Sequence, residues 1–149
     1  MAAFWRYLVA GVGLAAVLFG VLTVVYMTAP NTAPPAAPET QQTKGSEKGL
    51  FVATFAPENG TVKQGELHDW VLTLKTAAGT PVEGAIIEVS GGMPQHAHGL
   101  PTSPRATDYL GEGRYRISGV KFSMSGWWQL RFAITAPAGS DTVLFNIVL

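Results

Sequence analysis

The sequence WWQLRFAIT, residues 127–135, decides which fold this 149-residue chain can adopt. Its side chains alternate, and the apolar members of one face are Trp128, Leu130, Phe132 and Ile134. A period of two sends successive side chains to opposite faces of a β-strand, so one face is predicted to lie against a core. The stretch 67–75 alternates in the same way and predicts a second half-buried strand.

Five further stretches with strand character accompany these two, and turn sequences rich in Gly, Pro, Asn and Ser separate them. The seven predicted strands span residues 50–56, 67–75, 85–90, 105–110, 114–118, 127–135 and 142–149. No segment after residue 30 has the 3.6-residue apolar period of a helix. Short strands at this spacing predict an all-β, immunoglobulin-like seven-stranded β-sandwich over residues 49–149.

The N-terminal part of the chain has a different composition, because residues 7–29 are uncharged and mostly apolar. About 20 such residues can cross the ~30 Å hydrocarbon core of a bilayer as a helix. We therefore expect residues 1–29 to form a single transmembrane anchor and the Pro/Ala-rich residues 30–48 to form a flexible tether. A cleaved signal peptide is the alternative, although its apolar region would be unusually long and a clean cleavage site is missing.

The nearest charge to this segment predicts the orientation of the chain in the membrane. Arg6 biases the N-terminus to the cytoplasm. The C-terminal domain is then expected on the periplasmic or extracellular side of the inner (cytoplasmic) membrane.

Composition narrows the functions that the domain can have. Formal net charge is zero, and the seven Lys and Arg residues after residue 49 are scattered among eight Asp and Glu, so no basic stripe for nucleic acid is present. The absence of cysteine excludes disulfides, thiolate zinc sites and Cys nucleophiles. An enzyme is not expected, because the carboxylates are dispersed and no Gly-rich phosphate loop opens a helix.

The stretch GGMPQHAHG, residues 91–99, holds two of the three histidines and one of the four methionines. Imidazole and thioether are ligands for soft and borderline metals, copper above all. In an extended segment, the rings of His96 and His98 would point to the same side. Two imidazoles with thioethers suit Cu(I), whereas zinc is less favoured because residues 91–104 contain no Asp, Glu or Cys. The alternative interpretation is a polar surface loop without a ligand.

Strand counting predicts that further ligands lie near this stretch. If successive strands alternate in direction, the loops after the first, third and fifth strands share one end of the sandwich. These loops contain or adjoin the candidate metal ligands Met93, His96, His98, Met124 and His68. Packing in the hydrophobic core is an equally good interpretation of Met124. His68 is the least certain, since it shares parity with the core side of its strand and suits a hydrogen-bonded histidine at the rim.

Three motifs resemble those of the FixH/YtkA-like family: MPQHAHG at 93–99, GEGRY at 111–115, and FSMSGW at 122–127 followed by Arg131. The resemblance covers about residues 67–135. It implies a β-sandwich tethered by one N-terminal helix and associated with copper handling and haem–copper oxidase maturation. It also implies Met93, His96, His98 and Met124 as copper ligands, although this chain has Gln95 where many relatives have Met.

Two functions follow as hypotheses. The first is a membrane-anchored periplasmic protein that holds Cu(I) for delivery to a copper-receiving or haem–copper oxidase assembly partner. The second is a metal-free assembly or interaction module of a membrane complex, with Trp127 and residues 91–104 as its contact surface. Trp127 could instead shield a metal or pack on Met124.

Overall fold

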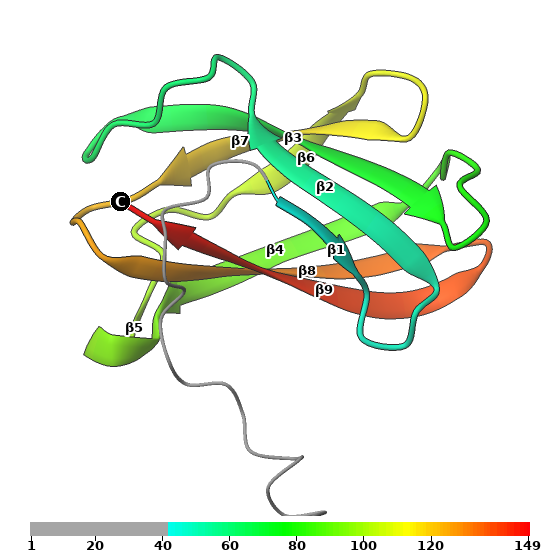
Figure 1. Ribbon diagram of the computed structural model, residues 1–149. Coiled ribbons are helices and arrows are strands. Elements are labelled where there is room, and N and C mark those ends of the chain that lie inside the picture. The colour runs from blue at the N-terminus through cyan, green and yellow to red at the C-terminus, as the bar shows by residue number, and fades with distance from the viewer. Residues whose placement is uncertain (1–41) are drawn as a thin grey trace, which may run out of the picture. The chain divides into compact units, whose positions relative to one another are not determined.

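A computed structural model describes residues 42–149 of the chain (Figure 1). These residues form nine β-strands and one three-residue 3-10 turn, which confirms the all-β prediction. All seven predicted strands are present, as β2 (Phe51–Pro57), β3 (Leu67–Thr76), β4 (Ile86–Met93), β6 (Arg105–Tyr109), β7 (Arg114–Lys121), β8 (Trp127–Ala136) and β9 (Gly139–Val148). The predicted anchor and residues 30–41 of the predicted tether lie outside the described residues. Within 42–149, no helix is long and apolar enough to cross a membrane.

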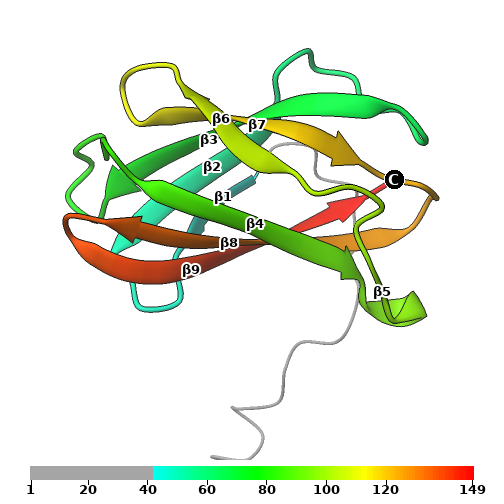
Figure 2. The same cartoon turned by 180° about the vertical axis from the view of Figure 1, so that it is seen from behind.

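The strands form two antiparallel sheets that pack as two layers (Figures 1 and 2). Sheet 1 has the order β1-β2-β3-β7-β6 and sheet 2 the order β5-β4-β8-β9, where β1 is Gln42–Gly45 and β5 is His98–Gly99. Without these two short strands, the orders are A-B-E-D and C-F-G, as in constant-type immunoglobulin sandwiches. A hydrogen bond from Gly65 N to Phe122 O (2.8 Å) joins the loops after β2 and β7, as strand counting predicts for loops that share one end.

The core between the sheets is rich in aromatic rings. Phe55 stacks on Trp70 within sheet 1, with 4.4 Å between ring centroids. The same Phe55 ring contacts Phe132 (4.9 Å) and Phe145 (5.4 Å) of sheet 2. All four side chains are fully buried, and each aromatic ring removes about 150–250 Å² from water. The four residues that the alternation of β8 predicts to be buried, Trp128, Leu130, Phe132 and Ile134, are buried, and Trp127 on the opposite face is buried as well.

The sandwich begins before residue 49, contrary to the predicted end of the tether. Gln42–Gly45 pairs antiparallel with β2. Gln42 is 4% exposed, and its side-chain amide bonds the backbone of Asn146 in β9. Strand β1 therefore contacts both sheets at this edge of the sandwich. The polar composition of residues 42–48 concealed this role, because backbone and amide hydrogen bonds hold the segment rather than apolar side chains.

A buried carboxylate, that of Asp141, holds the segment between β1 and β2 in place. Asp141 is 4% exposed and accepts hydrogen bonds from the backbone N–H groups of Lys48 (3.0 Å), Leu50 (3.2 Å) and Thr142 (2.7 Å). Burial alone would raise the pKa of Asp141, but hydrogen bonds from the Ser46 side chain and from these three N–H groups lower that pKa to about 2. Asp141 therefore ties the segment before β2 to the start of β9.

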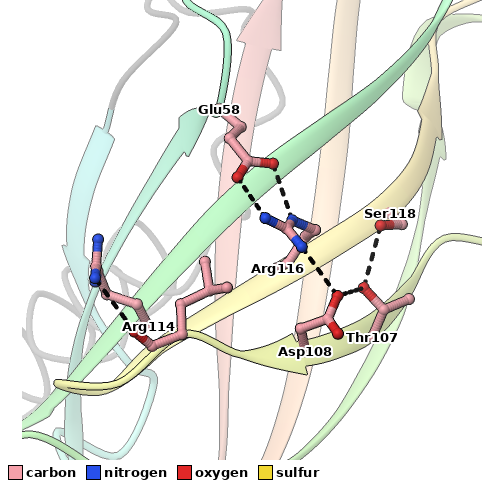
Figure 3. Close-up of polar contacts among 7 residues, drawn as sticks. Glu58, Thr107, Asp108, Arg114, Arg116 and Ser118 are labelled. Atoms are coloured by element: carbon pink, nitrogen blue, oxygen red, sulfur yellow. Dashed lines mark hydrogen bonds and ion pairs between the residues drawn. The ribbon is translucent and has the colours of Figure 1, made fainter.

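An ion-pair network crosses sheet 1 (Figure 3). Arg116 of β7 makes two hydrogen bonds to Glu58, from Nε (3.0 Å) and Nη2 (2.8 Å), and a third from Nη1 to Asp108 of β6 (3.2 Å). The hydrogen bonds from Arg116 lower the pKa of the Glu58 carboxyl. Because these side chains are partly exposed, water and salt weaken the network. It organises the surface of sheet 1 and contains none of the candidate metal ligands.

Candidate metal site

Two glycines let the predicted ligand segment lie against sheet 2. A Cβ on Gly91 would lie 2.2 Å from the carbonyl oxygen of Gln129 in β8, and one on Gly92 would lie 2.3 Å from that of His98 in β5. Neither strand can accommodate such a contact without moving its backbone. The Gly-Gly pair at the end of β4 therefore permits the close approach that holds residues 93–99, the histidine loop, beside the sheet.

The histidine loop is not extended, so the predicted geometry of the His-x-His pair is wrong. Pro94–His96 forms one 3-10 turn, with the proline at its start. Ala97 then adopts the left-handed conformation, with φ 53° and ψ 34°, and the chain reverses into β5. The rings of His96 and His98 nevertheless lie side by side, with centroids 5.9 Å apart and ring planes 24° apart. A turn therefore achieves the proximity that an extended strand was expected to give.

His98 has a free ring nitrogen in a defined tautomer. Its Nδ1 lies 3.2 Å from the carbonyl oxygen of Gly99, and a carbonyl can only accept, so Nδ1 carries the proton. The Nε2 lone pair is then available, which is the arrangement that metal-binding histidines usually have. Both His96 and His98 are exposed, so an ion in solution can reach their rings. One ion with bonds of about 2 Å to each ring requires nitrogens within about 4 Å of each other.

Met93 packs against residues 122–126, the methionine loop, which contains Met124. Met93 is 1% exposed, and its Cε lies 2.9 Å from where a Cβ on Gly126 would be. Gly126 has φ +124°, a conformation that favours glycine, and the end of the Met93 side chain lies against it. Met124, two residues earlier, is 39% exposed. Core packing, the alternative role proposed for Met124, therefore belongs to Met93.

Trp128 connects the histidine loop with the methionine loop. Its fully buried ring lies 5.7 Å from that of His98, at an angle of 65°. Its Nε1 donates a hydrogen bond to the carbonyl oxygen of Met124 (3.1 Å). Trp127, the predicted aromatic neighbour of the ligands, faces the other side of β8. There its Nε1 donates a hydrogen bond to Asn146 Oδ1 (3.0 Å). The aromatic ring beside the candidate ligands is therefore Trp128.

His68 does not join these residues. Its Nε2 lies 3.1 Å from the backbone nitrogen of Lys63 and 2.9 Å from the carbonyl oxygen of the same residue. The ring lines a separate hollow of about 250 Å³ together with Asn59 and Asp69, and none of the other four candidate ligands lines it. These contacts suit the hydrogen-bonded rim histidine that sequence analysis considered as an alternative.

A hollow of about 550 Å³ borders His98 on sheet 2, and we call it the β4–β8 hollow. Its lining includes Gly92, His98, Gln129 and Arg131. This hollow was not predicted from the sequence, although two features indicate it: the outward-facing side chains of β8 and the lack of side chains at Gly91 and Gly92. Within residues 42–149, no three His, Asp or Glu side chains are placed so that they could hold one metal ion together.

The GEGRY motif at 111–115 has a structural role. A Cβ on Gly113 would lie 2.3 Å from a backbone carbonyl oxygen of β3, so the turn requires glycine there. The Tyr115 hydroxyl donates to Val82 O (2.8 Å) and accepts from Ala85 N (3.0 Å). Burial raises the pKa of this hydroxyl. The motif thus anchors the segment before β4 and supplies no group to the candidate metal site.

The described domain is a two-sheet β-sandwich with His and Met side chains gathered on two loops at one end. Comparison with known families agrees with this description, because the YtkA-like family model matches residues 48–133, more than half of the chain. The protein therefore belongs to the YtkA-like family, and the match does not extend to the FixH part of the expected resemblance. No curated protein and no solved structure matches the chain.

Proposed function

We propose that this protein is a membrane-anchored copper-binding protein that holds Cu(I) through Met93, His96, His98 and Met124. The observation that carries the proposal is that the histidine loop and the methionine loop, 23 or more residues apart in the sequence, are joined through Trp128. The proposed anchor at residues 1–29 keeps this domain on the periplasmic or extracellular face of the inner membrane.

The chemistry of the donors supports copper over zinc. Two imidazole nitrogens and two thioether sulfurs are neutral and comparatively soft, which suits Cu(I). Zinc sites usually add thiolate or carboxylate ligands, and the two loops carry neither. The available Nε2 of His98, next to an Nδ1–H held by a carbonyl, is consistent with a metal ligand.

The exposure of the ligands supports a role in delivery. His96, His98 and Met124 all reach the surface, whereas Met93 is buried. An ion held in this way can pass to an incoming ligand from a partner, so copper is proposed as cargo. The proposed recipient is a copper-receiving protein or a haem–copper oxidase assembly partner.

An anaerobic Cu(I) titration of the full chain, in competition with a chromophoric Cu(I) chelator, tests the proposal. We expect one tightly bound equivalent and a loss of about 100-fold or more in affinity for His96→Ala/His98→Ala, because two of four ligands disappear. His68→Ala is the matched control and is expected to retain wild-type affinity. Absence of stoichiometric binding, or equal affinity of the double variant and the wild type, would contradict the proposal.

The β4–β8 hollow keeps the metal-free interaction module as a second candidate. At about 550 Å³, the hollow offers a surface beside the histidine loop for a protein partner. Trp127, once expected at that contact surface, is only 4% exposed. Recovery of a partner by His96→Ala/His98→Ala in the presence of a chelator would favour this candidate over copper delivery.

A further inference from the structure

We infer that Trp128 is a positioning residue of the copper site, which fixes Met124 relative to His98 through its indole N–H. The inference rests on the proposed function and adds to it a residue that binds no metal itself. It concerns the distance between the nitrogen ligands of one loop and the exposed sulfur ligand of the other.

Trp128 is suited to this task because it belongs to a rigid element. It lies in β8, which pairs with β4 on one side and with β9 on the other. Its ring is fully buried and packs edge-on against Phe122, with 5.5 Å between centroids. A side chain held in this way defines a fixed point for the flanking loops.

Both loops meet this fixed point. The His98 ring packs on the indole at 5.7 Å, and the indole N–H is bonded to the carbonyl oxygen of Met124. Neighbouring parts of the methionine loop have their own attachments, from Gln64 Nε2 to Ser123 O (3.1 Å) and from Gly126 N to Leu149 O (2.9 Å). The bond from Trp128 sets the position of Met124, which lies between these two attachments.

The energetic consequence is preorganisation of a sulfur ligand. A loop that must be ordered when the ion binds reduces affinity by the entropy of that ordering. Without the indole N–H, the Met124 carbonyl loses its donor, and the free energy of that hydrogen bond is lost as well. Removal of the indole N–H should therefore weaken Cu(I) binding by way of Met124, while the contribution of His96 and His98 persists.

The adjacent tryptophan provides a matched control. Trp127 and Trp128 are both buried, and each donates one hydrogen bond from Nε1. The acceptor is Asn146 for Trp127 and the methionine loop for Trp128. A Trp→Phe change removes one ring and one N–H at either position, but only at Trp128 does it release Met124.

The experiment is a double-mutant cycle on the full chain. Anaerobic Cu(I) affinity is measured for wild type, Trp127→Phe, Trp128→Phe, Met124→Leu and Trp128→Phe/Met124→Leu. We expect Trp128→Phe to bind roughly three- to tenfold more weakly, as the loss of one hydrogen bond allows, and Trp127→Phe to bind like wild type. In the Met124→Leu background, Trp128→Phe should have no further effect, because the sulfur it positions is absent.

X-ray absorption of the copper-loaded variants gives a readout that a purely structural role would not change. The sulfur shell around copper should weaken in Trp128→Phe and stay intact in Trp127→Phe. If Trp128→Phe unfolds, β-(3-benzothienyl)alanine at position 128 keeps the ring shape without the N–H and gives the same comparison. Equal affinities for the two Phe variants, or additive effects in the cycle, overturn the inference alone. Failure of the wild type to bind Cu(I) overturns the proposed function as well.

Discussion

The two ends of the sandwich differ in how deeply their polar side chains are buried and in whether partners within the chain satisfy them. At the end that holds the β8–β9 turn, the Asp141 carboxylate and the Tyr115 hydroxyl are buried, and each is engaged by partners within the chain. At the other end, His96, His98 and Met124 are exposed, and the Nε2 of His98 has an available lone pair. Satisfied buried groups stabilise a fold, whereas exposed donors on loops are suited to binding. The comparison assigns stability to one end and ligand binding to the other.

The largest effect is expected from a substitution at Gly91, because this residue affects both the stability of the sandwich and the position of the histidine loop. Gly91→Ala would place a Cβ 2.2 Å from a backbone oxygen of β8, so the strands must separate. We expect a loss of about 3 kcal/mol or more in the free energy of unfolding, together with a loss of Cu(I) binding. Gly99→Ala is the control, because its Cβ would meet only an ordinary 3.6 Å contact. Chemical denaturation of both variants measures the difference, and equal stability would refute the close-packing role.

Asp141→Asn tests the stability end alone. The amide cannot replace a carboxylate that accepts three backbone hydrogen bonds, so we expect a loss of about 2 kcal/mol in the free energy of unfolding. Cu(I) affinity should stay at the wild-type value. Glu88→Gln, an exposed change on β4, is the control for loss of one negative charge. A loss of copper affinity in Asp141→Asn would show that the two ends are not independent.

The same carboxylate predicts how stability depends on pH. Folding lowers the pKa of Asp141 to about 2 from the ordinary value of 3.8. The group therefore contributes its full stability above about pH 4, and this contribution is lost as pH falls towards 2. Glu58, whose pKa is also lowered, acts in the same direction. Urea unfolding between pH 5 and pH 2 should show a smaller decline for Asp141→Asn than for wild type. Parallel declines would contradict the lowered pKa.

The smallest effect is expected from the exposed network on sheet 1. Glu58→Gln removes the bidentate partner of Arg116, but both groups are partly exposed. The resulting loss of stability should be slight and should vanish in concentrated salt, whereas that of Asp141→Asn should persist. Thermal unfolding at low and high ionic strength separates the two. A salt-independent loss for Glu58→Gln would show that this network is shielded from solvent.

The alternation in residues 127–135 predicted a core-facing strand, because such a strand leaves a period of two in the sequence. The number and spacing of the seven predicted strands then predicted the sandwich. Strand β1 has no such alternation of apolar residues, because hydrogen bonds of the Gln42 amide and of the backbone hold it in place. Strand counting predicted which loops meet, but it could not distinguish the neighbouring Trp127 and Trp128 as partners of the ligands. The turn at Pro94–His96 was missed because Ala97, a residue without a turn preference, adopts the left-handed conformation.

Copper K-edge X-ray absorption of the full chain, loaded anaerobically with one equivalent of Cu(I), shows whether both loops bind the ion. We predict a first shell that contains both imidazole nitrogen and thioether sulfur, with the nitrogen scatterers lost in His96→Ala/His98→Ala and retained in His68→Ala. A first shell without sulfur, or one that the double variant leaves unchanged, would contradict a site formed by the histidine and methionine loops.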